Sequence, residues 1–246
     1  FTVIPTNNGV VEGYEGFKVN LLDSTYNTVA TSNGVVIADG QAAPNAGQTF
    51  TLTAGADLKT GSSGDDTFVG IVDTTTAANS TLNAGDNLAG AAGTDTLSVS
   101  ATGTGILSIA GVTLTDIERI QINNTSTGGT GTLNLATATG VKTIADFASS
   151  QALTVNNASS LLDAELSYGT NNLTLTYTAA TVAGTADVQN LKLTSQTSGT
   201  FTADGIETLN INSTIANNGS DLTDATKSVA IAQTGNTGIK TLTVSG

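Results

Sequence analysis

The sequence contains no Cys, no His, no Met and no Trp among its 246 residues. The absence of Cys and His excludes zinc sites built from these ligands, haem ligation by them, a thiol nucleophile and a Ser-His-Asp triad. Carboxylates, hydroxyls, amides, 4 Tyr and 7 Lys or Arg residues remain to bind or react. The lack of Cys also fits an extracellular protein that has no disulfides.

Positive charge is scarce: 7 Lys and Arg residues face 20 Asp and Glu residues, which gives a formal net charge of -13 at pH 7. A nucleic-acid-binding domain needs a basic surface to neutralise phosphates. The composition therefore excludes nucleic acid as a partner. Cations are attracted to such a chain instead.

Long hydrophobic runs are also missing. The sequence has no stretch of about 18 apolar residues that could cross a bilayer, and no basic segment followed by an apolar one that resembles a cleaved export signal. We therefore expect no membrane insertion. The lack of an initiator Met predicts an internal or processed piece of a longer polypeptide.

Strand-forming residues are abundant, since hydrophobic residues make up 38% of the chain and Val, Ile, Leu and Thr dominate it. This composition predicts a folded all-β protein rather than a disordered one. Short strands between Gly, Asn, Ser and Thr are typical of a β-solenoid or β-roll, in which each coil covers its neighbour. Ig-like β-sandwiches are the alternative, because they also contain short strands. One short helix is expected around Ser159–Leu166.

Internal repeats favour stacked coils. The segment Asp116–Asn123 returns as Gly205–Asn212, and Asp187–Leu193 is a looser third copy. A second theme, Gly140–Ile144, returns as Gly238–Leu242. Within the first theme, Glu118 and Glu207 are expected to be solvated.

Two segments match a nonapeptide turn motif, G-G-x-G-x-D-x-U-x, where U is apolar. Gly61–Val69 matches it with Ser in place of the second Gly, and Gly90–Ser98 matches it with Ala there. Another Asp lies nine residues before the Asp of each motif: Asp57 before Asp66, and Asp86 before Asp95. Gly55 lies two residues before Asp57. The sequence thus holds two tandem pairs of candidate turns.

Such turns suit a calcium ion, a hard cation that takes about six to eight oxygen ligands from carboxylates and carbonyls. Glycine permits positive φ in the turn, and the Asp supplies negative charge. Two pairs are expected to share ions: Asp57 with Asp66, and Asp86 with Asp95. The candidate ligands and turn glycines are Asp57, Asp66, Asp86, Asp95, Asp65, Asp73, Gly55, Gly64 and Gly93. The alternative is that these carboxylates only accept hydrogen bonds within Asx turns.

The turns lie within Thr51–Gly70 and Thr81–Leu97, and this block resembles calcium-binding S-layer proteins of Gram-negative bacteria, relatives of the RTX proteins secreted by the type I route. The segment Asp116–Glu118 also resembles the strand that comes after the block in that family. The resemblance implies an extracellular, cell-surface structural protein, with Ca2+ as its cofactor. Copies of the chain would assemble into a two-dimensional lattice, and a cell-surface polysaccharide is a further candidate partner.

Three regions are expected from these patterns. Residues 1–45 are predicted to be the terminal strands of a β (Ig-like) domain or a cap. Residues 46–100 form the RTX-like calcium-binding block. Residues 101–246 form Thr/Asn/Gly-rich solenoid coils that continue beyond this sequence.

Two other functions compete with the surface-layer hypothesis. The carboxylate pairs Asp116 with Glu118, and Asp163 with Glu165, are close enough for a glycosidase. A sugar-cleaving site normally contains aromatic platforms, however, and aromatic residues make up only 4% of this chain. We therefore expect no enzymatic activity. The remaining alternative is a type I secreted RTX-type adhesin or surface fibre stalk, which differs from a lattice subunit in its assembly.

Overall fold

The structure is a computed structural model that describes residues 14–17, 20–22, 24–25, 27–31, 35–38, 46–214, 228–233 and 238–245. The chain divides into two compact units, residues 1–45 and 46–246. The first unit contains two antiparallel strand pairs. These are β1 (Tyr14–Phe17) with β4 (Val35–Ala38), and β2 (Asn20–Leu22) with β3 (Thr28–Thr31).

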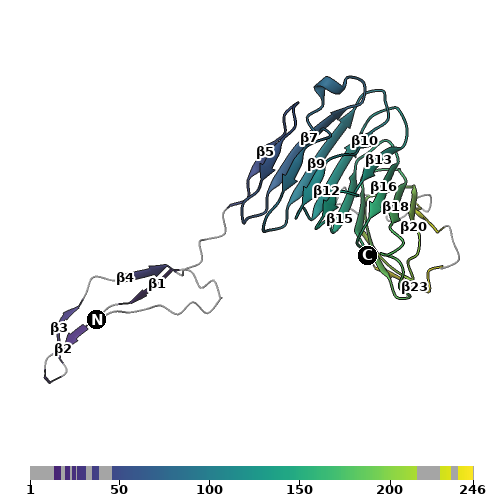
Figure 1. Ribbon diagram of the computed structural model, residues 1–246. Coiled ribbons are helices and arrows are strands. Elements are labelled where there is room, and N and C mark those ends of the chain that lie inside the picture. Colours follow the sequence, from purple (N-terminus) through teal and green to yellow (C-terminus); the bar gives the residue numbers. More distant parts are fainter. Residues whose placement is uncertain are drawn as a thin grey trace. The chain divides into compact units, whose positions relative to one another are not determined.

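The second unit is a β-solenoid whose short strands stack in three parallel sheets (Figure 1). The long sheet has nine strands. In chain order they are β5 (Thr49–Thr51), β7 (Thr67–Asp73), β9 (Thr96–Thr102), β12 (Arg119–Asn124), β15 (Thr143–Phe147), β17 (Asp163–Ser167), β19 (Val188–Thr194), β21 (Thr208–Thr214) and β23 (Thr241–Ser245).

Two shorter sheets complete the coils, with six and four strands. The six-stranded sheet contains β10 (Ser108–Ile109), β13 (Gly131–Asn134), β16 (Leu153–Ala158), β18 (Leu173–Tyr177), β20 (Thr200–Ala203) and β22 (Ala230–Ala232). The four-stranded sheet contains β6 (Leu58–Thr60), β8 (Asn87–Ala89), β11 (Thr113–Thr115) and β14 (Ala138–Thr139). The prediction of an all-β solenoid is confirmed. Parallel pairing excludes the Ig-like alternative for this unit, because Ig-like sheets are antiparallel.

The core is a set of apolar ladders that run through the coils. Phe68, Leu97, Ile120 and Ile144 are in register on successive strands of the long sheet, and each is fully buried. Side chains alternate between the core and the outside along most strands, such as β9, β12 and β19, which is the pattern that the sequence predicted. Near the first coils the Phe50 ring stacks on Phe68 with ring centroids 5.0 Å apart. Burial of these ladders is the main stabilising contribution, since no coil can cover its own apolar face.

The internal repeats are equivalent strands of the long sheet. The copies at 116–123, 187–193 and 205–212 overlap β12, β19 and β21 respectively. Asp116 and Gly205 occupy the same place in their copies, and both have positive φ, 50° and 82°. The long sheet runs from β5 to β23, so the predicted regions 46–100 and 101–246 belong to one compact unit.

The helix expected around Ser159–Leu166 is wrong. Residues Asp163–Ser167 form strand β17, in which Ala164 and Leu166 point into the core with a period of two. Within the described ranges, the only helical element is the short 3-10 turn η1 (Ala77–Asn79). In that same part of the chain, no helix has the length and apolar character needed to span a membrane.

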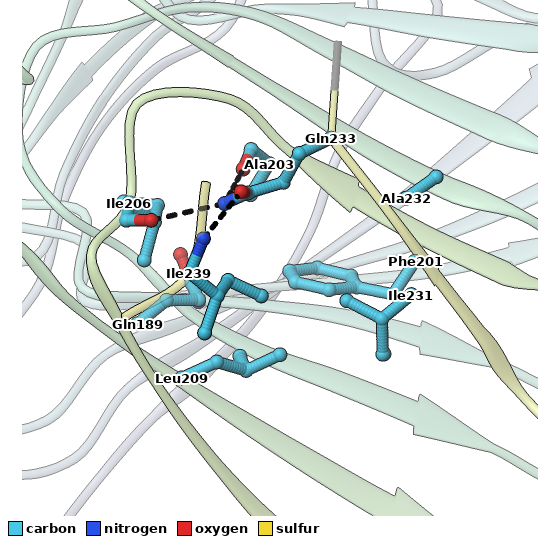
Figure 2. A pocket seen from close by; sticks show the side chains of 9 residues that line it. All are labelled: Gln189, Phe201, Ala203, Ile206, Leu209, Ile231, Ala232, Gln233 and Ile239. Carbon is cyan, nitrogen blue, oxygen red and sulfur yellow. Dashed lines mark hydrogen bonds between the residues drawn. The ribbon is translucent and has the colours of Figure 1, made fainter. Parts of the chain in front are cut away.

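Directly after β22, Gln233 connects neighbouring coils by hydrogen bonds, beside apolar side chains that pack on the core. Figure 2 shows the Gln233 side chain between the backbones of neighbouring coils. Its amide nitrogen donates to the carbonyls of Ala203 (3.2 Å) and Ile206 (3.0 Å), and its oxygen accepts from the Ile239 N–H (2.9 Å). The adjacent cavity has a volume of only about 10 Å³, which is the size of a single water site rather than a ligand site.

Candidate metal centre

Acidic residues stand directly before three successive strands of the long sheet. Asp66 precedes β7, Asp95 precedes β9 and Glu118 precedes β12. Each carboxylate accepts a hydrogen bond from the backbone of the preceding coil. Gln48 N donates to Asp66 (2.5 Å), Asp66 N to Asp95 (2.7 Å) and Asp95 N to Glu118 (2.9 Å). We call Asp66, Asp95 and Glu118 the acidic ladder.

A second acidic corner lies where the strands of the four-stranded sheet begin. Asp57 precedes β6 and Asp86 precedes β8. Asp57 N donates to Asp86 Oδ1 at 2.8 Å, and Asn83 N donates to Asp86 Oδ2 at 2.8 Å. Lys59 Nζ lies 3.4 Å from Asp57 Oδ1. Burial tends to raise the pKa of Asp57, but hydrogen bonds from Thr53 and the Lys59 cation outweigh it and hold that pKa below its usual range.

The predicted pairs, Asp57 with Asp66 and Asp86 with Asp95, are not the pairs that hydrogen-bond between stacked coils. Asp57 contacts Asp86, and Asp66 contacts Asp95; in both pairs the partners are 29 residues apart. The reason is the length of the coil. Turns nine residues apart begin strands of different sheets, whereas turns 29 residues apart stack on neighbouring coils.

Asp65 and Asp73 have different positions. Asp65 is exposed, and its Oδ1 accepts a hydrogen bond from Thr94 N at 2.7 Å, which joins two neighbouring coils beside the acidic ladder. Asp73 lies at the opposite end of β7 from Asp66, about 20 Å away for an extended strand. Its carboxylate accepts from Asn79, Thr76 and Thr75, and these hydrogen bonds lower its pKa. Asp73 therefore caps the η1 loop and does not join the other candidates.

The turn glycines do not all behave as predicted. Gly93 has φ of 128°, and a Cβ there would lie 2.7 Å from the Gly64 carbonyl oxygen, so these two glycines stack on neighbouring coils. Gly55 and Gly64 do not have positive φ, so the expected conformation is wrong for them. Gly55 has open space around its Cα, with nothing within 4 Å of a built Cβ. Close packing thus requires glycine at Gly93 but not at Gly55.

Asp95 carries the least compensated charge of the acidic ladder. Its side chain is fully buried, and its Oδ2 has no hydrogen-bond partner in the described part of the chain. Burial raises the pKa of Asp95, and the charges of Asp66, Glu118 and Asp65 raise it further against one backbone hydrogen bond from Asp66. A buried anion with like charges around it favours a bound cation.

Both carboxylate oxygens of Asp66 accept backbone hydrogen bonds, unlike those of Asp95. Hydrogen bonds from Gln48 N and Ser62 N outweigh the effect of burial and lower the pKa of Asp66. Ser62 N donates to Asp66 Oδ2 at 2.5 Å. No equivalent bond reaches Asp95 Oδ2 from the described residues, and Ala91, which takes the place of Ser62 in the second motif, has φ of 75°. The free oxygen is therefore specific to the second motif.

Oxygen atoms converge on two glycines at these corners. A Cβ on Gly90 would lie 2.3 Å from Asp95 Oδ2 and 1.9 Å from the Asp116 carbonyl oxygen. A Cβ on Gly61 would lie 2.4 Å from Asp66 Oδ2 and 2.3 Å from the Gly90 carbonyl oxygen. Each glycine thus leaves space in which a carboxylate and a carbonyl oxygen face each other.

This donor set fits calcium, which takes carboxylate and carbonyl oxygens and needs no nitrogen or sulfur. Within the described ranges, no three Asp or Glu side chains come together as a metal-binding group. Carbonyl and solvent oxygens would therefore have to supply most ligands of an ion at Asp95. The groups that could hold it are Asp95 Oδ2, which has no hydrogen-bond partner among the described residues, and the Asp116 carbonyl oxygen beside Gly90.

Sequence reasoning missed the role of Glu118 and Glu207, and the expectation that both are solvated is wrong. Glu207 is buried and accepts a hydrogen bond from Asp187 N at 3.0 Å, as Glu118 does from Asp95 N. The Glu118 side chain is only 14% exposed. The sequence did contain a signal for this role, since the two Glu residues occupy the same place in two copies of the repeat. Equivalent corners need equivalent hydrogen-bond acceptors for the backbone N–H of the preceding coil.

The carboxylate pair Asp163 with Glu165 lies on the outer face of β17, beside a hollow of about 430 Å³. Glu165 forms ion pairs with Arg119 (2.7 Å) and Lys192 (3.9 Å). Asp163 accepts a hydrogen bond from Asn190 at 2.8 Å. Both carboxylates thus have partners on the outer face of the sheet.

Close stacking of the corners can be tested with two glycine substitutions. We expect Gly61→Ala to lower the free energy of unfolding by about 1 to 3 kcal/mol, because its Cβ would overlap backbone and carboxylate oxygens. Gly55→Ala is the matched control in open space and should change stability by less than about 0.5 kcal/mol. Urea unfolding followed by circular dichroism measures both. Equal effects at the two positions would contradict the stacking.

Comparison with known proteins does not assign the chain to a family. No family model matches it, and the search of curated proteins found no match. The function is therefore argued from the solenoid and its acidic corners.

Proposed function

We propose that this chain is part of a non-enzymatic, extracellular surface-layer subunit in which calcium stabilises a β-solenoid, and that copies of the subunit assemble into a lattice. The observation that carries the proposal is Asp95. Its carboxylate is fully buried, one oxygen has no hydrogen-bond partner among the described residues, and three other acidic residues raise its pKa. A bound Ca2+ would neutralise this charge and supply the missing interaction.

Calcium binding would be coupled to folding because the acidic ladder exists only when neighbouring coils stack. Asp66 and Asp95 come together across 29 residues, and Glu118 joins them across another 23. In a calcium-poor compartment these carboxylates repel one another and oppose stacking. Outside the cell the ion would stabilise the stacked coils, since a ligand that binds only the folded state shifts the equilibrium toward it.

The outer surface of the solenoid supports a role in regular assembly. Hydroxyl side chains form a ladder in register on five successive strands of the six-stranded sheet, from β10 to β20. They are Ser108, Thr132, Thr154, Thr174 and Thr202. Strands in such a sheet are about 4.8 Å apart, so the hydroxyls form an evenly spaced row on a rigid support. Repeated contacts between identical copies can use a surface of this kind.

Imaging of assembly tests the function. Protein freed of calcium with a chelator is returned to calcium, to magnesium or to chelator alone, and each sample is followed by light scattering and negative-stain electron microscopy. We expect ordered two-dimensional arrays with calcium and dispersed particles in the other two samples. The Asp95→Asn variant should need more calcium to form arrays.

Three outcomes separate the surface lattice from other functions. Extended single rods in calcium would contradict the lattice and favour the adhesin or fibre stalk. Arrays that form equally well in chelator would contradict the role of calcium. Dispersed particles in all three samples would contradict assembly by this chain.

A further inference from the structure

A hollow of about 430 Å³ lies beyond the C-terminal ends of β15, β17 and β19 in the long sheet. Its walls carry hydroxyl groups from three successive coils. The hydroxyl residues that line it are Ser149, Ser150, Tyr168, Thr170, Ser195 and Thr197. None of the described residues that line it is charged. We call it the Tyr168 hollow.

An exposed aromatic pair stands at this corner. The rings of Phe147 and Tyr168 meet edge to face with centroids 5.4 Å apart. Phe147 is 39% exposed and Tyr168 is 48% exposed. An aromatic ring on a folded surface exposes apolar area to water, which is unfavourable. Aromatic residues are enriched at surfaces that a binding partner covers. The sequence alone gave no sign of this pair, because 21 residues separate its members and only the coil brings them together.

The backbone fixes the position of these side chains. Ala148, Tyr168 and Ser195 stand at equivalent corners, and their φ values are 50°, 57° and 49°. Each backbone N–H donates to the next coil: Ala148 to Ser167 (2.7 Å), Tyr168 to Thr194 (2.9 Å) and Ser195 to Thr214 (3.0 Å). Positive φ costs about 1 kcal/mol or more at a residue other than glycine, and such strain concentrates at functional sites.

Further hydrogen bonds hold the rim of the hollow. Asn171 donates its side-chain amide to the Ser149 carbonyl, and Gly169 N donates to Gln196 Oε1 at 3.0 Å. Thr197 Oγ1 donates to the Gly169 carbonyl at 3.3 Å. The hollow is therefore formed before a ligand arrives, which lowers the entropic cost of binding.

We propose that the Tyr168 hollow binds a neutral saccharide. A sugar ring offers an apolar C–H face that packs on an aromatic ring, and hydroxyls that exchange hydrogen bonds with Ser and Thr. Its volume is in the range of small-ligand sites, about 300 to 1,000 Å³. The uncharged lining and the net charge of -13 disfavour an anionic sugar.

This site is independent of calcium and of lattice formation. The acidic ladder stands before the first residues of the long-sheet strands, whereas the Tyr168 hollow lies past their last residues. Binding can therefore be measured on dispersed protein kept in chelator. A failure to form a lattice would leave the saccharide site unaffected.

Affinity electrophoresis through gels that contain dextran, mannan or galactan tests the proposal, with alginate as an anionic comparison. We expect at least one neutral polysaccharide to retard the wild-type chain. Calorimetric titration with a hexasaccharide of that polymer should then show an affinity about tenfold lower for Tyr168→Ala than for the wild type. Tyr168→Phe should bind nearly as well as the wild type, because it keeps the ring.

Ile106→Ala is the matched control, since Ile106 is also a large exposed side chain (61%) but does not line the hollow. It should bind like the wild type. Circular dichroism melting of each variant verifies that it is folded. No retardation by any neutral polymer, stronger retardation by alginate, or equal affinity of wild type and Tyr168→Ala would each overturn the proposal.

Discussion

Asp95→Asn is expected to change the stability of the chain in opposite directions with and without calcium. Without calcium the variant should melt at a higher temperature than the wild type, because it removes a buried negative charge that Asp66, Glu118 and Asp65 repel. With saturating calcium it should melt at a lower temperature, because the carboxylate that would hold the ion is lost. The reversal of sign distinguishes a metal ligand from a structural hydrogen-bond acceptor.

The size of the calcium effect follows from mass action. At a calcium concentration about 100 times its dissociation constant, binding adds about 2.7 kcal/mol to the free energy of unfolding. For a chain of this size, that corresponds to a rise in melting temperature of roughly 5 to 10 °C. We expect this rise in the wild type and little of it in Asp95→Asn. Thermal unfolding followed by circular dichroism, in chelator and in calcium, measures both.

Asp73→Asn is the matched control for this experiment. Asp73 is also an acidic residue of the calcium-block sequence, but its carboxylate caps the η1 loop at the opposite end of β7. The Asp73→Asn variant should be less stable than the wild type by the same amount in chelator and in calcium. The rise in its melting temperature on adding calcium should therefore match that of the wild type. If Asp95→Asn also lost stability equally in both solutions, its carboxylate would be only a turn cap.

Much of the fold was predictable because one physical rule repeats in every coil. Strand residues alternate between core and surface, and the apolar positions of the repeats therefore revealed β12, β19 and β21 as equivalent strands. The same period, applied to Leu162, Ala164 and Leu166, would have predicted strand β17 in place of the expected helix.

The contacts between coils were not predictable from motif spacing. The backbone-to-carboxylate partners are 29 residues apart for Asp66 and Asp95, 23 for Asp95 and Glu118, and 20 for Asp187 and Glu207. The coil length thus changes along the chain with the length of its loops. A fixed spacing of nine finds the turns, but it does not show which turn stacks on which.

A buried Asp was also missed, although strand alternation could have found it. Asp146 lies in β15 in register with Ile122 and Leu166, both of which are core residues. It is 3% exposed, and neither carboxylate oxygen has a hydrogen-bond partner within the described ranges. Burial raises its pKa to about 6, although the Ser149 hydroxyl nearby opposes the shift. An acid at an aliphatic position of the ladder makes stability depend on pH.

Asp146→Asn is expected to stabilise the chain at pH 7.5 and to have little effect at pH 4. The pKa of Asp146 rises from an ordinary value of 3.8 to about 6 on folding, so the unfolded chain releases this proton first as the pH rises. Stability from this group is therefore complete below about pH 4 and is lost between about pH 4 and pH 6. The loss amounts to roughly 2 to 3 kcal/mol, which the variant avoids because its amide does not ionise.

Urea unfolding of the wild type and Asp146→Asn at several pH values between 4 and 8 measures this difference. No charged side chain among the described residues contributes to the shift at Asp146, so the difference between the two proteins isolates its own titration from that of the acidic corners. Parallel pH profiles for the wild type and Asp146→Asn would show that the carboxylate is compensated. In that case an ion or a water molecule would have to reach the core at this corner, and the aliphatic ladder would not be continuous through β15.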